Sequence, residues 1–392
     1  MFRNRYGIAV ALRFHEQPMN KTSFRIALLC STVVIGAASE YAEARTSHTQ
    51  RAHAVSKSSA PQTGTKAKPA LRHSPSTLEA RSDESVHVTG AAYGDGVSNT
   101  TPGGGLMPVQ TAPRSQSGIT RDFIAKMSPT SNVQALIGNL PGVVTYSQDP
   151  LGVSGDSLNI RGMNEEQIGY LFEGIPIADP IRYAPYTGTI VDTENLGSVT
   201  VSQGSPDVDA PLYNAVGGQI TMSEINPSHK AGGYLSLTGG THSTNKEFLR
   251  LETGEIGHTG IRGFVSYSHM SWNNWRGPGG GTRHHTDAKF IKEWGDGNSV
   301  SAVFGYNATK YTSYMNPTMA AWNKYGRSYN YDGHYTLGDA NYYGLNQTIN
   351  NAMTVMAPSH FTLSNHLKLN VAPYYVHMFG PSVLGQNFIT SN

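Results

Sequence analysis

Cysteine is almost absent from this 392-residue sequence, which contains Cys30 alone. Charge is scarce too, at 14% of residues against about 25% in soluble domains. A net charge of +2 argues against a nucleic-acid partner, which needs a marked basic excess. No apolar run of about 18 residues occurs beyond the N-terminus, which excludes a membrane protein built from helices. Abundant Gly (43) and Tyr (21) instead favour an all-β chain with long polar loops.

The N-terminal residues 1–44 read as a signal peptide, with Met19 as the expected start. A basic region, a short apolar region and a small-residue cleavage site follow in order: Lys21 and Arg25, Ile26–Ala38, and Ala42-Glu43-Ala44. The alternative for the apolar region is a buried core helix. Because Cys30 falls inside the signal, we expect the mature chain to have neither a disulfide nor a cysteine–metal site.

Residues 45–118 have the composition of a disordered tether. They are rich in Ser, Thr, Ala, Pro, Gly and Lys, with eight Lys or Arg and four Asp or Glu, and offer too little apolar surface for a core. Only Glu84–Gly90 departs from this, because Val86 and Val88 alternate with polar residues. Such a lone strand is a candidate for pairing with the sheet edge of another protein.

Residues 119–226 predict a small α+β domain. Helices are expected at Arg121–Met127 and Asn132–Ile137, the second capped by Ser131. Short apolar runs predict strands at Val143–Tyr146, Ser157–Ile160, Gln167–Phe172 and Ser198–Val201. Four Lys or Arg against twelve Asp or Glu give this domain a net charge of −8.

Residues 227–392 change to long strands in which apolar and polar residues alternate. The expected strands include Tyr234–Thr238, Phe264–Met270, Val300–Tyr306 and Asn365–Val376. Short turns alternate with longer polar loops, the longest over Thr312–Asn351. This pattern predicts antiparallel strands of a transmembrane β-barrel. A secreted β-sandwich would also show the alternation of residues.

Five sequence elements in the acidic domain occur in the order found in the plug of TonB-dependent outer-membrane receptors. They are Leu136–Val143 ("LxxLPGV"), Leu158–Gly162 ("xxIRG"), Tyr170–Ile177 ("xLxDGxPI"), Glu194–Val201 ("ExIExVEV") and Val201–Met222 ("RGPxxxLYGxxAxGGxINI"). The chain thus resembles that family, with a plug at 119–226 followed by barrel strands. Glu84–Gly90 similarly resembles a TonB box; the alternative is an accidental Val-rich patch.

The resemblance implies particular site residues. Those expected to contact TonB are Glu84, Val86, Val88 and Thr89. Those that carry the plug motifs are Leu140, Pro141, Gly142, Arg161, Gly162, Glu173, Gly174, Gly204, Asn214, Gly217 and Gly218. Two positions depart from the family, with Asn214 where Gly is usual and Gln203 where Arg is usual. Family plugs pair that Arg and the Arg of "IRG" with barrel glutamates, so this charge lock is expected to be weaker or rebuilt.

Two further groups of side chains are candidates for ligand contact. Trp322, Tyr329, Tyr331 and Tyr335 lie in or beside the predicted long loop, as a stacking surface for a ligand or as an interfacial aromatic girdle. His284 and His285 lie in a predicted loop over Gly277–Thr286, where a polar role is favoured over metal binding. No catalytic motif is present, and we expect no enzyme activity, no metal site and no cofactor.

The resemblance implies TonB-driven uptake across the outer membrane, with TonB, membrane lipid and a small-molecule ligand as partners. A ferric siderophore is the expected ligand, with haem, cobalamin or oligosaccharide open. The alternatives are a binding-only outer-membrane or secreted β-protein, or a non-functional or split-gene fragment. A complete family barrel of about 22 strands at about 9–11 residues each exceeds the residues after 226. We therefore expect an incomplete barrel of about six to eight strands.

Overall fold

The computed structural model describes residues 8–13, 96–110, 114–153, 156–179, 183–212, 214–295, 297–364 and 366–385, which belong to one compact unit. Residues 14–44 of the predicted signal segment and the TonB box candidate, Glu84–Gly90, lie outside the described residues. No helix in the described ranges is long and apolar enough to cross a membrane.

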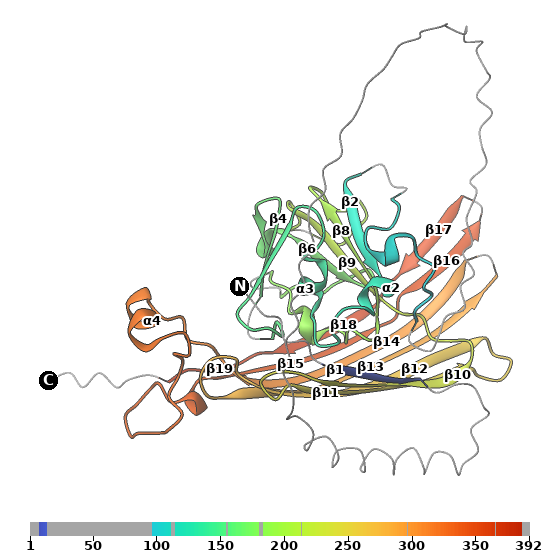
Figure 1. The fold of residues 1–392 in the computed structure, drawn as a ribbon. Coiled ribbons are helices and arrows are strands. Elements are labelled where there is room, and N and C mark those ends of the chain that lie inside the picture. The colour runs from blue at the N-terminus through green and yellow to red at the C-terminus, as the bar shows by residue number, and fades with distance from the viewer. Residues whose placement is uncertain are drawn as a thin grey trace, which may run out of the picture. The chain divides into compact units, whose positions relative to one another are not determined.

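The first part of the fold is the predicted α+β domain, called the plug below (Figure 1). A five-stranded sheet has the order β2 (Gln116–Thr120), β8 (Leu196–Gln203), β9 (Gly218–Glu224), β6 (Gly169–Phe172) and β7 (Ile175–Pro176). β6 and β9 run parallel, and the other pairs are antiparallel. A second sheet joins β3 (Val143–Ser147), β4 (Asp156–Ile160) and β5 (Met163–Asn164).

Short helices connect these strands. They are η2 (Pro102–Gly105), α2 (Arg121–Ile124), α3 (Val133–Ile137), η3 (Glu165–Gln167) and η4 (Thr187–Thr189). The predicted cap of α3 was wrong by one residue, because the Asn132 side chain, rather than that of Ser131, accepts the hydrogen bond from the Ala135 N–H at 2.9 Å. Apolar residues of both plug sheets and of α2 and α3 form one buried core, which Val303 and Met356 of the following sheet extend.

The plug begins earlier than predicted. Ser98 and Thr101 bind the Asp122 carboxylate, with Ser98 N and Oγ each at 2.7 Å and Thr101 N at 3.1 Å. Burial opposes ionisation of Asp122, but these hydrogen bonds outweigh it and lower the pKa of the carboxyl. Residues 96–110 and strand β2 therefore belong to the plug, which corrects the expected tether over 45–118 at its C-terminal end.

An antiparallel sheet follows the plug (Figure 1). Its main path is β1 (Ile8–Arg13), β10 (Ala231–Gly239), β11 (Asn245–Glu255), β12 (Ile261–Asn273), β13 (Gly280–Trp294), β14 (Asn298–Thr312), β15 (Gln347–Met356) and β18 (Tyr374–Phe379). Off this path, β16 (Ser359–Ser364) pairs with β14 and with β17 (Leu367–Val371), and β19 (Ser382–Val383) pairs with β15. Within the described residues the sheet is open, as expected.

Connections at the two ends of the sheet differ in length. Short turns over 256–260 and 295–297 join strands at one end, here called the short-turn end. At the other, the long-loop end, the connection 313–346 carries α4 (Met319–Tyr325) and η5 (Tyr343–Leu345). The single strand predicted over 365–376 was wrong, because the chain breaks between β17 and β18 at Pro373, which has no N–H for a ladder.

The two faces of this sheet have opposite character. The plug covers one face, here called the inner face, and there β11 buries Lys246, Phe248, Arg250 and Glu252. On the outer face the same strand exposes Leu249 and Leu251 at 44% and 43%. β12 and β14 likewise expose Val265, Tyr267, Phe304 and Tyr306. Charges turned inward and apolar side chains turned outward reverse the usual arrangement of a soluble protein.

Candidate functional site at the plug–sheet interface and the long-loop end

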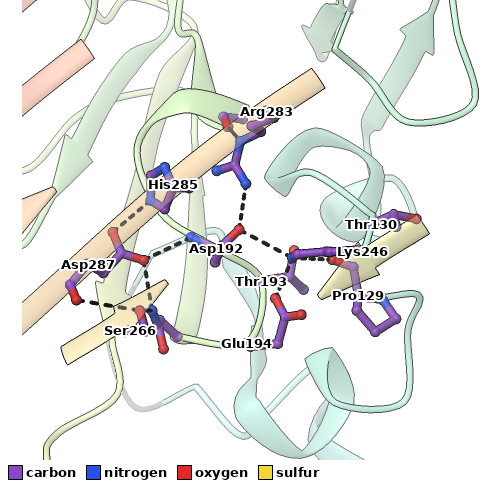
Figure 2. A network of polar contacts seen from close by, with 12 residues as sticks. Pro129, Thr130, Asp192, Thr193, Glu194, Lys246, Ser266, Arg283, His285 and Asp287 are labelled. Atoms are coloured by element: carbon purple, nitrogen blue, oxygen red, sulfur yellow. Dashed lines mark hydrogen bonds and ion pairs between the residues drawn. The ribbon is translucent and has the colours of Figure 1, made fainter. Parts of the chain in front are cut away.

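A buried loop of the plug, Asp192–Asn195, docks on the inner face of the sheet. It lies between η4 and β8 and is turned back on itself by the Asn195 N–H, which donates to the Asp192 carbonyl at 2.9 Å. All four of its residues are buried. Polar side chains this deep need partners, and the sheet supplies them from β11, β12 and β13 (Figure 2).

Basic side chains of the sheet bind the acidic side chains of this loop. Arg283 Nη1 lies 2.6 Å and Lys246 Nζ 3.2 Å from Asp192 Oδ1, and Lys246 Nζ also lies 2.6 Å from Glu194 Oε2. Lys246 further donates to the Pro129 carbonyl of the plug at 2.9 Å. Arg250, fully buried, donates to the Glu194 carbonyl at 3.0 Å and to Asn195 Oδ1 at 3.1 Å.

Asp287 on β13 is the acidic member of the sheet side. Its Oδ2 accepts from Asn195 Nδ2 at 2.7 Å and from the Asp192 N–H at 3.3 Å. Its Oδ1 lies 2.7 Å from His285 Nε2. Asn195 also donates to Ser266 Oγ on β12 at 2.7 Å, so three strands hold the loop together.

A second contact lies at the turn between β6 and β7. Glu173 Oε1 accepts from Lys289 Nζ of β13 at 3.0 Å and from the Glu224 N–H at 2.6 Å. Both carboxylate oxygens of Glu224 are buried without a hydrogen-bond partner among the described residues. Burial and the nearby Asp287 raise the pKa of Glu224 well above its usual range, although Lys289 acts against this.

The two acids of the docking loop respond differently to burial. For Asp192, burial opposes ionisation, but Lys246 and Arg283 outweigh it and hold the pKa well below its usual range. For Glu194, burial raises the pKa, with the single cation Lys246 acting against it. The ionised form of Asp192 is therefore favoured, which supports its ion pairs with Arg283 and Lys246.

Donor atoms of Asp192, His285 and Asp287 lie within 4.8 Å of one another, as in a metal site. Their surroundings do not suit a cation, because Arg283 and Lys246 already contact Asp192. Both ring nitrogens of His285 are also engaged, with Asp287 and with Asn307. The cluster works as a polar joint between plug and sheet.

The predicted loop position of His284 and His285 was wrong, since both lie within strand β13. Adjacent strand residues point to opposite faces. His285 is fully buried on the inner face, whereas His284 lies on the outer face, 2.8 Å from the Tyr267 hydroxyl and with its ring 4.7 Å from that of His269.

The first group of predicted plug motif residues meets around Gln203. Gln203 Nε2 donates to the Pro141 carbonyl at 2.5 Å, and the Arg161 N–H donates to the Gly142 carbonyl at 3.0 Å. Arg161 Nη2 donates to Ser115 Oγ at 2.7 Å, which in turn lies 3.4 Å from Gln203 Oε1. Leu140 is buried in the plug core, and Gly162 follows Arg161 with a φ of 85°.

The glycine-rich motif depends on close backbone approach. Gly218 has a φ of 126°, and a Cβ there would lie 2.2 Å from the Ser202 carbonyl oxygen. A Cβ on Gly217 would lie 2.6 Å from Met163 Cβ, and Gly204 has a φ of 110°. The Asn214 side chain donates to the Glu166 carbonyl. Glu173 and Gly174, both at positive φ, form the turn that carries the contact with Lys289.

The docking residues were missed by the sequence motifs. Those on the sheet are Lys246, Arg250, Arg283, His285, Asp287 and Lys289. Two signals pointed to them. Charged residues occupy every second position from Arg283 to Lys289, and the plug carries a net charge of −8 that requires basic partners. The contacts have reversed polarity relative to the lock implied by the resemblance, with acids on the plug and cations on the strands.

An aromatic cluster around Arg276 joins the long-loop end to the plug. Its guanidinium lies 5.5 Å from the ring centres of Trp275 and Tyr314 and 5.8 Å from that of Trp322. Arg276 Nη2 donates to the Met315 carbonyl at 2.6 Å. Trp275 Nε1 donates to the Gln148 carbonyl of the plug at 2.9 Å. Two loops and the plug thus meet at one buried cation.

The four aromatic residues predicted to bind ligand fall into separate groups on the loop 313–346. Trp322 contacts Arg276, and Tyr331 is half-buried close to it. Tyr329 stacks on Tyr325 with ring centres 4.7 Å apart. Tyr335 is exposed and meets the edge of Tyr342 at 5.5 Å. The loop therefore brings two of the four together.

Comparison with known proteins agrees with this architecture. Residues 108–218 match the family model of the TonB-dependent Receptor Plug Domain. Comparison with curated proteins gave no match. Among solved structures, the ferric citrate transporter FecA in the unliganded form has 15% identity and a TM-score of 0.56, covering 70% of this chain and 41% of that chain.

Two other receptors have similar folds. The ferripyoverdine receptor of Pseudomonas aeruginosa has 14% identity and a TM-score of 0.55, covering 74% of this chain and 39% of that chain. The ferric yersiniabactin uptake receptor FyuA from Yersinia pestis has 15% identity and a TM-score of 0.55, covering 70% and 42%. The chain spans about two fifths of the length of these structures.

The chain therefore carries a TonB-dependent receptor plug domain, followed by antiparallel strands with the fold of those receptors. This confirms the plug domain expected from the five motifs and the expected fold class.

Proposed function

We propose that this chain acts as a TonB-dependent receptor in the outer membrane and takes up a scarce small-molecule ligand. TonB-dependent receptors are transporters rather than enzymes. The observation that carries the proposal is the division of polarity across the sheet. Leu249, Leu251, Val265 and Phe304 point outward, while the charged inner face holds an acidic plug. An apolar outer band and a polar interior are the arrangement of strands that face lipid.

The TonB box candidate, Glu84–Gly90, supplies the energy coupling in this proposal. Its alternating Val86 and Val88 suit strand addition, in which main-chain hydrogen bonds give affinity to a partner strand. In this proposal a signal peptide that starts at Met19 and is cleaved after Ala44 delivers the chain to the periplasm, so strand β1 (Ile8–Arg13) would not remain in the sheet of the mature chain. The short-turn end of the sheet then faces the periplasm. A pull on the tether reaches the plug at residues 96–101, which bind Asp122.

The ligand enters from the long-loop end and is a ferric siderophore. Support comes from the chemistry named for the similar structures, which are a ferric citrate transporter, a ferripyoverdine receptor and a ferric yersiniabactin receptor. The cluster of Arg276, Trp275, Tyr314, Trp322 and Tyr331 suits such a ligand, since flat chelating rings stack on aromatic faces and their negative charge is attracted by a guanidinium.

Binding of ⁵⁵Fe-labelled chelates to outer membranes from cells that produce this chain tests the ligand class. A panel of citrate, catecholate and hydroxamate complexes is used, with haem and cobalamin as competitors. We expect saturable binding of one ferric chelate, weakened by the double change Trp322→Ala and Tyr331→Ala. The matched control is Trp294→Ala, at the short-turn end and exposed on the sheet. Competition by haem or cobalamin, or equal loss in both variants, would contradict the assignment.

A further inference from the structure

A row of three metal-ligating side chains crosses the outer face of the sheet towards its long-loop end. Glu247 of β11 is the register partner of His269 on β12, and His269 is the register partner of His284 on β13. Register partners point to the same face of an antiparallel pair. The residues next to them along the strands, among them Met270 and Arg283, are buried on the inner face, so the row faces outward.

The two histidines of the row already lie together. Their ring centres are 4.7 Å apart. His284 Nδ1 lies 2.8 Å from the Tyr267 hydroxyl, which can accept the Nδ1–H and leave the Nε2 lone pair for a metal. A hydrogen bond of this kind orients metal-ligating histidines in proteins. The His269 ring forms no hydrogen bond with any residue that the structure describes, so its nitrogens are available as ligands.

Glu247 is an acidic residue on a face that is otherwise apolar along its strand. Its outer-face neighbours on β11 are Leu249 and Leu251, both exposed. Among the described residues Glu247 forms no ion pair. Lys310, an exposed cation of the same face, is three strands away, or about 14 Å at the usual spacing of strands. Ionisable side chains on lipid-facing positions are costly and mark functional sites, so this carboxylate needs a cation.

We propose that Glu247, His269 and His284 bind a divalent transition-metal ion, with Zn²⁺ as the best fit, and that the ion clips β11, β12 and β13 together. Because neighbouring strands lie about 4.8 Å apart, Glu247 and His284 flank His269 at similar distances and converge over the central strand. The exposed Glu247 side chain must turn towards the histidine pair, which is already formed. Two imidazoles and one carboxylate suit Zn²⁺ better than Mg²⁺ or Ca²⁺ and leave a fourth position for water.

The row lies where the outer face changes from apolar to polar. One step towards the short-turn end are Leu249 and Tyr267, and one step towards the long-loop end are Ser271 and Thr282. Aromatic residues such as Tyr267 are typical of the membrane–water boundary, so an ion reaches the row from water. The sequence favours a polar role for His284, because the row appears only when the register of three strands is known. The inference holds whatever ligand the chain takes up.

Zn²⁺ alone is the probe in the first test. The full chain, made without a histidine tag and purified in detergent, is titrated against a chromogenic chelator. We expect one site of highest affinity, which is lost in His269→Asn and in His284→Asn and weakened in Glu247→Gln. Tyr267→Phe, which removes the orienting hydroxyl, should weaken it by about tenfold. Equal affinity in the parent and in either histidine variant would overturn the proposal.

The matched control is His360→Asn, at an exposed histidine of β16 on the same sheet, which should bind Zn²⁺ as the parent does. Cu²⁺ in place of Zn²⁺ gives a spectroscopic signature, because the electron paramagnetic resonance spectrum reports the number of nitrogen ligands. Two are expected in the parent and in Glu247→Gln, and one in each variant of the row that lacks a histidine. A nitrogen count that does not change when His269 or His284 is replaced would contradict the site.

A disulfide test separates a failed fold from a failed site. With Cys30→Ser as background, His269→Cys and His284→Cys are combined in one chain. Register partners have Cα atoms about 4.5–5.5 Å apart, within the range of about 4.4–6.8 Å that a disulfide spans. Mild oxidation should therefore join the two thiols. If the bond forms but the parent binds no Zn²⁺ through these histidines, the metal site is refuted; if the bond does not form, the register that creates the row is refuted.

Discussion

Replacement of Lys246 by Met gives the sharpest test of the reversed-polarity docking contacts. Within the described residues, every hydrogen-bond and ion-pair partner of the Lys246 ammonium belongs to the plug. These partners are Glu194 Oε2 at 2.6 Å, the Pro129 carbonyl at 2.9 Å and Asp192 Oδ1 at 3.2 Å. Methionine keeps the length of the side chain and removes the charge. Breaking one half of a buried pair costs about 3–5 kcal/mol.

The lower end of this range applies to Lys246→Met, because neither Asp192 nor Glu194 is left as an unpaired buried charge in the variant. Asp192 retains Arg283 at 2.6 Å, and Glu194, whose pKa burial already raises, takes up a proton. We expect a loss of seating of about 3 kcal/mol, or roughly 150-fold in a labelling ratio. This ratio divides the maleimide labelling rate of Val303→Cys, a position 2% exposed in the core shared with the plug, by that of Leu337→Cys, a position 90% exposed, both in a Cys30→Ser background.

The double variant Lys246→Met with Glu194→Gln should recover much of the loss, since neither side then leaves an unpaired charge. Lys310→Met, on an exposed position of β14, is the matched control and should leave the ratio unchanged. Parent-like labelling in Lys246→Met, or a double variant no better than the single one, would refute the role of these contacts.

Three other changes test separate parts of the account. Val88→Pro removes a backbone donor needed for strand addition, so crosslinking to TonB should vanish while membrane insertion persists; crosslinking at the parental level would exclude Glu84–Gly90 as the box. Gly218→Ala should lower the free energy of unfolding, measured by denaturant titration, by about 1–3 kcal/mol. The reason is that a Cβ at this position, with a φ of 126°, would lie 2.2 Å from the Ser202 carbonyl oxygen. Gly232→Ala, where a Cβ meets nothing within 4 Å, should be nearly neutral, and equal effects of the two changes would contradict the turn argument. Glu224→Gln should have the denaturation midpoint of the parent at pH 5 and a higher midpoint than the parent at pH 8. Burial and Asp287 raise the pKa of Glu224 in the folded state, so this carboxyl destabilises the fold only at pH values above the ordinary pKa of a glutamate. An unchanged midpoint at pH 8 would show that Glu224 does not destabilise the fold.

Alternating residues were sufficient to predict much of the sheet. Tyr234–Thr238, Phe264–Met270 and Val300–Tyr306 all fall within observed strands, because apolar side chains on the outer face mark every second position. The sequence predicts a loop over part of β13, because Arg283, His285 and Asp287 place charge where a soluble strand would bury apolar groups. The break at Pro373 was missed because the apolar alternation continues on both sides of it.

The docking site was harder to predict from the sequence than the fold. The residues around Gln203 belong to plug motifs that can be recognised in the sequence, although they are as far apart along the chain as the docking residues are. The docking loop instead joins Asp192 and Asn195 to Lys246, Arg283 and Asp287 on three different strands. Which strands face the loop depends on register and on the face that the plug covers, and neither is determined by spacing. The sequence carried two signals, the net charge of −8 in the plug and the charged residues at every second position from Arg283 to Lys289, and neither shows which groups pair.

Accumulation of ⁵⁵Fe from the bound ferric chelate, compared between host cells with and without TonB, tests the proposed transport most directly. Cells that produce this chain should accumulate iron only when TonB is present, and deletion of Glu84–Gly90 should abolish accumulation without reducing binding to outer membranes. Accumulation that is equal in the two hosts, or binding that never leads to TonB-dependent accumulation, would contradict the account.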